Sequence, residues 1–159
     1  MNIRHIALLA VAAAAFVSTG VSAQTATASD PLDVTATVVE SCSVTTTDMS
    51  FGNYDHLAGT TSTATVSVTC SSGTGFEILL GDGDNFATDR RMKNGTTNFL
   101  AYTLKDPTNA SNWGGVADSG VSATADGSVQ PFTVNGAIAA GQTVPAGAYV
   151  DQVSVTVAY

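Results

Sequence analysis

The sequence of 159 residues has few of the side chains on which most catalytic, metal-binding and nucleic-acid-binding sites depend. It contains two cysteines, two histidines, one tryptophan and only five Lys or Arg residues, and 11% of its residues are charged. Thirteen acidic residues leave a net charge of −8, and a surface of that sign repels nucleic acid and anionic lipid. We therefore expect no nucleic-acid partner, and nothing in this composition calls for a cofactor.

The sequence also lacks an apolar run long enough to span a bilayer. The run Ile6–Val17 has twelve residues, whereas a membrane helix needs about 20. Arg4 and His5 precede it and the small residues of Val21-Ser22-Ala23 follow it, an order typical of a cleaved secretory signal. We predict a signal peptide over residues 1–23, with a membrane anchor as the alternative, and no membrane span in the mature chain.

Cys42 and Cys70 are the only cysteines. Two cysteines in a secreted chain most simply form a disulfide. A metal site would need more ligands than His56, the only histidine after the predicted signal, can add. We predict a Cys42–Cys70 disulfide, which should stabilise the fold by about 3.5 kcal/mol on the chain-entropy model.

Strict alternation of apolar with polar or small residues is the main positive signal. At the end of the sequence Val153, Val155, Val157 and Tyr159 alternate in this way, as expected for a strand with one buried face, which we extend over residues 148–159. Because this predicted strand runs to the final residue, its outer edge should be left open unless another segment covers it. A second alternating strand is predicted near the start of the mature chain, at Leu32, Val34, Ala36 and Val38.

Further short strands are expected between turns rich in Gly, Asp and Asn. They lie within Met49–Tyr54, Thr61–Cys70, Phe76–Leu80 and Phe99–Leu104, with one or two more within Val121–Thr133. Six to eight short strands without helical periodicity predict an all-β sandwich.

Two loops invite a chemical interpretation. The loop Gly81–Asn85 could form a calcium site from Asp82, Asp84 and Asp89, but Phe86 and Ala87 break the EF-hand pattern, and a solvated turn is favoured. Arg90, Arg91 and Lys93 form a basic cluster that we expect to pair with neighbouring Asp residues or to dock another acidic subunit.

Neither of two further candidate side chains supports catalysis. His56 follows Asp55, but the sequence contains no G-x-S-x-G motif and no expected free cysteine, so a surface-turn histidine is favoured. Trp113 could stack on a sugar, but a core or rim position is favoured for a single Trp in a small sandwich. We therefore predict that the protein is not an enzyme.

Several stretches, in this order and spacing, resemble the spore coat protein U family, which contains the secreted pilins of archaic, Csu-type chaperone–usher systems. They are Cys42-Ser43-Val44, Phe51-Gly52-Asn53-Tyr54, Val66-x-Val68-x-Cys70, Arg91-Met92, Leu100-x-Tyr102-x-Leu104, Trp113-Gly114, Gly136-x-Ile138, Gly141-Gln142, Gly147-x-Tyr149-x-Asp151 and Val153-x-Val155-x-Val157-x-Tyr159. The resemblance covers the chain from about Leu32 to Tyr159.

The resemblance implies an incomplete immunoglobulin-like β-sandwich that lacks its last strand and is completed by donor-strand exchange. A periplasmic chaperone would lend the missing strand first. At the outer-membrane usher, the N-terminal extension of the next identical or related pilin subunit would replace it, and main-chain hydrogen bonds would supply affinity. The protein would pass through the periplasm of a Gram-negative bacterium to the cell surface.

These inferences predict a structural subunit of an adhesive pilus that supports surface attachment and biofilm. Residues 1–23 would be the signal, 24–37 the donor segment and 38–159 the pilin domain, with the domain's own first strand beginning before Cys42. Leu32, Val34 and Ala36 would be the donor face, and Val153, Val155, Val157 and Tyr159 the acceptor strand, with Tyr159 carrying its carboxylate to the chaperone. The alternatives are a secreted binding module, such as a tip adhesin or a small lectin using Trp113, and a secreted enzyme.

Overall fold

A computed structural model describes residue 20 and residues 24–114 and 119–159. The chain divides into two units, Met1–Ala36 and Thr37–Tyr159. In the first unit, residues 24–36 have no regular secondary structure and are exposed, Leu32 by 86% and Val34 by 85%. The strand predicted around residues 32–38 is therefore not formed, because an isolated alternating segment has no ladder partner. The predicted signal lies outside the described residues, apart from Gly20.

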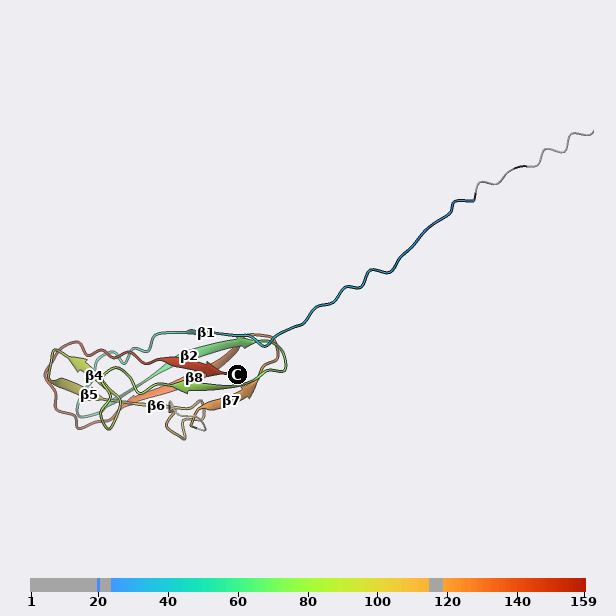
Figure 1. Cartoon of the computed structure of the whole chain (residues 1–159). Helices are drawn as coiled ribbons and strands as arrows, with labels where there is room; N and C mark the ends of the chain where they lie inside the picture. The colour runs from blue at the N-terminus through green and yellow to red at the C-terminus, as the bar shows by residue number, and fades with distance from the viewer. Residues whose placement is uncertain (1–19, 21–23, 115–118) are drawn as a thin grey trace, which may run out of the picture. The chain divides into compact units, whose positions relative to one another are not determined.

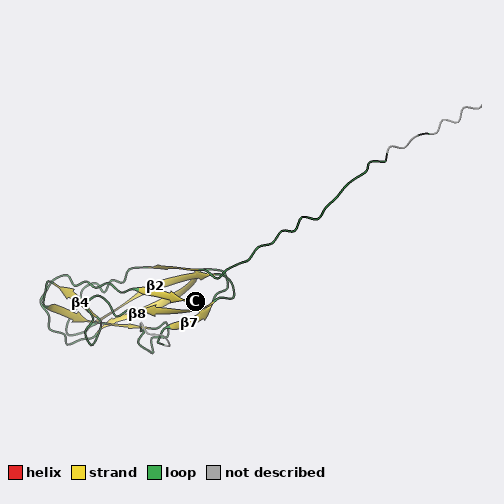
Figure 2. Cartoon of the chain, viewed as in Figure 1, coloured by secondary structure: helices red, strands yellow, loops and turns green. Residues whose placement is uncertain are grey.

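The second unit consists of antiparallel strands joined by turns and loops, and the described part of the chain contains no helix (Figures 1 and 2). The strands are β1 (Cys42–Thr46), β2 (Thr60–Cys70), β3 (Gly75–Leu80), β4 (Arg91–Asn94), β5 (Asn98–Ala101), β6 (Thr103–Lys105), β7 (Val121–Thr124), β8 (Gln130–Ile138) and β9 (Val155–Ala158). Within these ranges no helix is long and apolar enough to cross a membrane.

The larger sheet has the order β1-β2-β8-β6, with β2 paired on both sides. Strand β2 alternates as its sequence predicts: Val66, Val68 and Cys70 are buried, while the Thr and Ser residues between them are more exposed. This pattern directs one face of the sheet to the core and one to solvent.

A second sheet has the order β7-β3-β9, and β4 and β5 form a separate hairpin. Strand β3 contributes Phe76, Ile78 and Leu80 to the core. Trp113 is fully buried between the strands, and its indole Nε1 donates a hydrogen bond of 2.7 Å to the carbonyl of Ile78. The single tryptophan is therefore a core residue with its polar atom satisfied.

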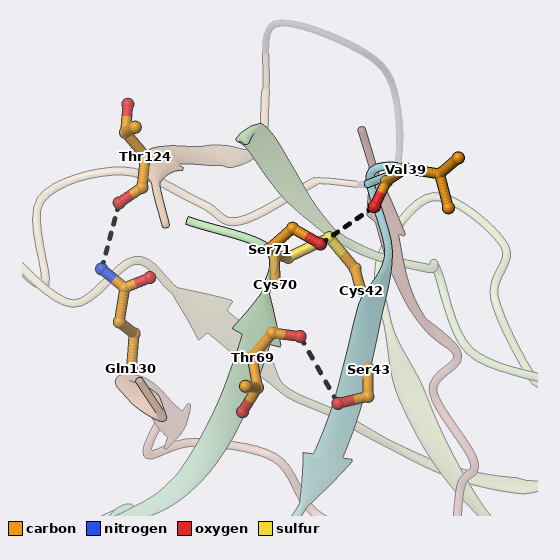
Figure 3. Close-up of a disulfide and its surroundings, with 8 residues drawn as sticks. All are labelled: Val39, Cys42, Ser43, Thr69, Cys70, Ser71, Thr124 and Gln130. Atoms are coloured by element: carbon orange, nitrogen blue, oxygen red, sulfur yellow. Dashed lines mark hydrogen bonds between the residues drawn. A yellow bond between two sulfur atoms is a disulfide. The ribbon is translucent and has the colours of Figure 1, made fainter. Parts of the chain in front are cut away.

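The predicted Cys42–Cys70 disulfide is present and joins the first residue of β1 to the last residue of β2 (Figure 3). The two cysteines face each other in the β1–β2 register. Around them, the Ser71 hydroxyl donates to the carbonyl of Val39 at 3.2 Å and the Ser43 hydroxyl to that of Thr69 at 3.4 Å. The disulfide thus fixes the point at which the chain enters the sandwich.

Four sequence-based boundaries are corrected by the structure. The domain's first strand begins at Cys42 rather than before it, and residues 49–54 form no strand. The predicted strand at 99–104 is divided between β5 and β6, because the main-chain N–H of Tyr102 between them donates to the carbonyl of Arg90 rather than to a strand of either ladder. Strand β4 lies in a stretch that was expected to be loop, since Arg91 and Lys93 offer no apolar alternation to reveal it.

Candidate functional site

The last strand lies at the edge of the second sheet with one face toward the core. Val153, Val155 and Val157 are half-buried and pack against the core, while Gln152, Ser154, Thr156 and Ala158 are exposed. The side chain of Tyr159 is 60% exposed. The regular strand is shorter than expected, because Gln152 and Ser154 pair with the loop residues Asp84 and Gly81 rather than with a strand.

The hydrogen-bond pattern shows which main-chain groups of this strand are used. The carbonyls of Gln152 and Ser154 accept from Asp84 and Gly81 at 3.1 and 2.8 Å, and Val150 exchanges two bonds with Lys93. In an antiparallel ladder the main chain of alternate residues points to opposite sides. The N–H and C=O groups of Val153, Val155 and Val157 therefore point away from β3, toward a side where no described strand pairs.

Strand β1 presents a second open edge. Ser41 and Thr47 bond to Ser71 and Thr65 of the β2 side at 2.9 and 3.0 Å. By the same alternation, the main-chain groups of Cys42, Val44 and Thr46 point away from β2. Cα atoms of β1 and β9 come within 8 Å of one another, and within the described ranges no backbone ladder joins the two strands.

A groove of about 460 Å³ begins at Thr46, the last residue of β1, and Val155, the first residue of β9. Residues 46–49 and 51 line it, as do residues 149–153 and 155 and the core residues Val66, Leu80, Leu104 and Val134. Core side chains thus reach the surface where the two unpaired strand edges end. Unpaired edges of this kind attract a further strand.

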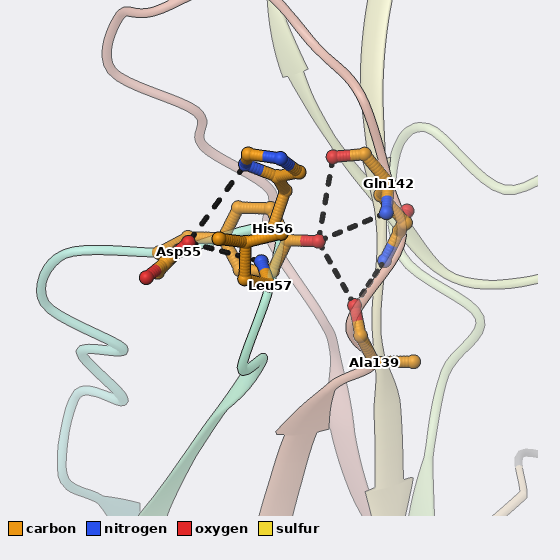
Figure 4. Close-up of polar contacts among 6 residues, drawn as sticks. Asp55, His56, Leu57, Ala139 and Gln142 are labelled. Carbon is orange, nitrogen blue, oxygen red and sulfur yellow. Dashed lines mark hydrogen bonds and ion pairs between the residues drawn. The ribbon is translucent and has the colours of Figure 1, made fainter.

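A second hollow of about 690 Å³ continues from this groove and shares Met49, Phe51, Met92 and Tyr149 with it. Gln142 anchors its wall, since its side chain donates to the carbonyl of Ala101 at 2.8 Å and accepts from the Ala101 N–H at 2.7 Å. The Tyr54 hydroxyl donates to the carbonyl of Ala139 at 3.0 Å and accepts from the main-chain N–H of Gln142 at 3.1 Å. Figure 4 shows the contacts around Gln142 and Ala139.

Asp151 forms a polar end to the inward row of the last strand. Its carboxylate accepts hydrogen bonds from the Tyr102 hydroxyl at 2.6 Å and from the side chain and main-chain N–H of Asn85 at 2.9 and 3.2 Å. Burial raises the pKa of Tyr102 well above its ordinary value, and the hydrogen bond to Asp151 raises it further. The neutral phenol is therefore the form that the fold holds in place.

The Gly- and Asp-rich loop that suggested a calcium site packs on this carboxylate. Gly83 has a φ of +88°, and a Cβ there would collide with Asp151. Among the residues described, no three His, Cys, Asp or Glu side chains are grouped so that they could hold a metal. The contacts of Asp151 with Gly83 and Asn85 thus pack this loop on the last strand.

The arginines of the basic cluster do not form the expected pairs with neighbouring Asp residues; docking to another subunit stays a prediction. Arg90 is 9% exposed and donates to the carbonyls of Leu80 and Gly81 at 2.6 and 2.8 Å. Burial lowers its pKa from the ordinary value, while the charges of Asp82 and Asp151 oppose that shift. Arg91 donates to the carbonyl of Asn85 at 2.6 Å and stacks 4.0 Å from the Phe99 ring centre. Both guanidinium groups thus bind main-chain carbonyls rather than Asp side chains.

His56 and Trp113 occupy the positions that the favoured interpretations gave them. The His56 ring lies 3.7 Å from the Asp55 carboxylate, and both side chains are more than half exposed (Figure 4). Trp113 has no exposed surface, so its ring cannot stack on a sugar in this conformation.

Comparison with known proteins gives this all-β, antiparallel architecture a family. The sequence model of the Spore Coat Protein U domain matches residues 28–156. "Protein U" of Myxococcus xanthus is 32% identical over 179 residues, and the alignment covers 100% of both chains. The chain belongs to the Spore Coat Protein U domain family.

The chain is also similar to solved pilus proteins. One match is a chain in the crystal structure of the CsuC–CsuE chaperone–tip adhesion subunit pre-assembly complex from the archaic chaperone–usher Csu pili of Acinetobacter baumannii, with a TM-score of 0.60 and 27% identity. It covers 77% of the present chain but only 40% of that chain. The minor tip subunit HdaB of the E. coli Hda pilus gives a TM-score of 0.40 at 17% identity over 72% of this chain and 79% of that chain, too weak to support an argument. The predicted all-β, immunoglobulin-like sandwich is confirmed.

Proposed function

We propose that the protein is a structural subunit of a secreted adhesive pilus, assembled by the chaperone–usher pathway through donor-strand complementation. The observation that carries the proposal is the groove between β1 and the last strand. It combines the two requirements of strand addition, which are free main-chain groups on both edges and an apolar interior for alternate side chains.

The acceptor side of this site is the strand containing Val153, Val155 and Val157, with Tyr159 at its exposed end. A strand seated between β1 and β9 needs roughly 9–10 Å between its two neighbours. The two edges, which approach within 8 Å, therefore part slightly when the strand enters.

The donor is residues 24–37 of another copy, with Leu32, Val34 and Ala36 entering the groove. In support, these three side chains are exposed and stand at period two in a segment without secondary structure. Such a segment loses little structure of its own when it joins a neighbour's sheet.

The partners that follow from this proposal are a periplasmic chaperone, an outer-membrane usher and further identical or related subunits. The chain would be exported by the signal at residues 1–23 and would reach the bacterial surface as part of a fibre that promotes attachment and biofilm. It would have no enzymatic activity. A small lectin using Trp113 is the less supported alternative because that side chain is buried.

The test is a pair of matched substitutions, one on each side of the exchange. Val34→Asp should leave the chaperone complex intact, because the chaperone fills the groove and residue 34 belongs to the donor. It should nevertheless stop polymerisation. Losing one buried Val costs about 1.5–3 kcal/mol, and desolvating an unpaired carboxylate adds several kcal/mol more.

Val155→Asp should abolish both chaperone binding and fibre assembly, because Val155 is part of the acceptor. Co-purification with the chaperone, followed by electron microscopy of the cells, reads out both effects. Equal loss of chaperone binding in the two variants would assign Val34 to the subunit's own core and refute the donor assignment.

A further inference from the structure

The outward face of the last strand carries an apolar and basic patch beside the groove. We call Val150, Lys93, Arg91 and Phe99 the outer patch. Val150 and Lys93 exchange main-chain bonds of 2.8 and 3.1 Å, so their side chains share a face. Val150 is 69% exposed while Tyr149 and Asp151 on either side are half-buried, which makes that face the outer one.

Two features of the outer patch have no counterpart along the rest of the strand. Val150 is followed on the outward row by Gln152, Ser154, Thr156 and Ala158, so it is the only large apolar side chain there. In the residues that the structure covers, the single ion pair joins His56 to Asp55, so neither Arg91 nor Lys93 meets a carboxylate, although the chain has thirteen acidic residues.

The proposed donor has a matching apolar residue at its end. If Leu32, Val34 and Ala36 point into the groove, the odd-numbered residues point outward. From residue 33 to residue 39 these are Asp33, Thr35, Thr37 and Val39, and only Val39 among the four is apolar. Val39 is 71% exposed, and the exposed carboxylate of Glu40 follows it directly.

We infer that Val39 of a second copy docks beside Val150 on the outer patch and sets the register of the exchanged strand. This inference rests on the proposed function. The contact joins the one large apolar side chain on each outward row.

This contact fixes both direction and register. In an antiparallel arrangement, Val39 opposite Val150 puts Ala36, Val34 and Leu32 opposite Val153, Val155 and Val157, respectively. All three donor side chains then share a face with the half-buried acceptor row. A parallel arrangement with the same contact would carry residues 24–38 past the start of the last strand and leave the groove empty.

The register can be trapped with an engineered disulfide between copies. Val39 and Val150 would form a non-hydrogen-bonded antiparallel pair, with Cα atoms roughly 4.5 Å apart, within the span of a disulfide. Full-length V39C/V150C, with Cys42 and Cys70 retained, should give a ladder of covalent oligomers on non-reducing gels of surface fibres. The matched T37C/V150C variant shifts one cysteine by two residues, to a diagonal distance of roughly 7–8 Å, and should crosslink about tenfold less.

Equal crosslinking of the two variants, or more in T37C/V150C, would overturn the register while fibres still form. If the unaltered chain forms no fibres, the proposed function falls and this inference with it. The two failures are therefore distinguishable.

Discussion

At the scale of single residues, Tyr102 connects the last strand to the middle of the chain. Its hydroxyl donates to Asp151, its ring packs against Phe51 with centres 6.2 Å apart, and its main-chain N–H bonds to Arg90. Because Asp151 also accepts from Asn85, one carboxylate holds the loop and the strand together. The stability of this end of the groove should therefore depend on the neutral phenol.

The unfolding free energy should fall at alkaline pH, and Tyr102 should account for part of that fall. Its pKa is raised in the folded state by burial and by Asp151, whereas an unfolded tyrosine ionises near pH 10. The stabilisation is fully present below about pH 10 and is lost as the pH rises toward the folded pKa. Denaturant unfolding of the chaperone complex between about pH 8 and 12 measures it.

Tyr102→Phe is the control for this pH effect. It should lower stability near neutral pH, because Asp151 loses a hydrogen-bond donor, by about 1–3 kcal/mol. It should also flatten the alkaline part of the curve. An unchanged alkaline slope would show that other groups carry the pH dependence.

The residues of this network could not be found from the sequence. Tyr102 and Asp151 are 49 positions apart, and the short motifs in which they stand do not indicate that the two side chains meet. The Gly81–Asn85 loop attracted attention for its carboxylates, but its structural partner is the carboxylate of Asp151, on a distant strand. The spacing of residues in the sequence predicts that a turn forms, but the side chain against which the turn packs depends on how the strands are arranged in the fold.

At the scale of elements, Met49 and Phe51 cover one glycine of β8. A Cβ at Gly136 would collide with the Met49 sulfur and lie 2.9 Å from Cζ of Phe51. Both side chains line the groove. Residues 49–51 can therefore pack this closely on β8 because residue 136 has no side chain.

Gly136→Ala should push Met49 and Phe51 into the groove, lower stability by about 1–3 kcal/mol, and weaken chaperone binding. Gly75→Ala is the matched control, because Gly75 is also a strand glycine and a Cβ there meets nothing within 4 Å. It should be neutral or stabilise by about 0.4–1 kcal/mol. Thermal unfolding and chaperone titration compare the two variants, and equal effects would contradict this role for Gly136.

The predicted strands are correct where apolar and polar residues alternate and the apolar ones are buried within the chain's own sheets. Thr61–Cys70 and Phe76–Leu80 were predicted almost as they occur in β2 and β3. Strand β4 was missed because its outward residues are charged, and the alternating segment at residues 32–38 has the pattern without the strand. Alternation shows that a segment has an apolar face that can be buried, but a strand forms only where it can also hydrogen-bond to a neighbouring strand.

At the scale of the whole molecule, the proposed function predicts that the mature chain is not stable alone. An apolar groove between two open edges should lead to aggregation or proteolysis, and a co-expressed chaperone should rescue the protein. Expression with and without the chaperone, followed by size-exclusion chromatography, measures this. A soluble monomer that unfolds cooperatively without chaperone would contradict it, unless its own N-terminal segment had entered the groove.

A donor supplied in the same chain should have the same effect as the chaperone. Residues 28–39, joined after Tyr159 through a flexible linker, can turn back and fill the groove in the antiparallel register. We expect a soluble monomer, and a midpoint of thermal unfolding at least about 10 °C lower when the attached segment carries Val34→Asp. Equal midpoints for the two forms would show that the groove does not take up this segment.

The overall class of the fold was accessible from the sequence because short alternating strands, turn residues and the ordered motifs agree with one another. The groove was accessible only as an expectation that the last strand would be uncovered. Its second wall is residues 46–51, which carry no distinctive pattern apart from Phe51-Gly52 and were partly expected to be strand. Which edges remain unpaired depends on strand order, and strand order is a property of the whole molecule.

The disulfide determines how the domain resists tension applied from its N-terminal side. Strand β1 has a single partner, so a pull on its first residue would otherwise unzip it from β2 one hydrogen bond at a time. Cys42 passes the force to Cys70, the last residue of β2, which is held by β1 on one side and β8 on the other. The force must then shear two ladders together, so the covalent bond at the entry point lets an edge strand resist a pull that its own hydrogen bonds would not withstand.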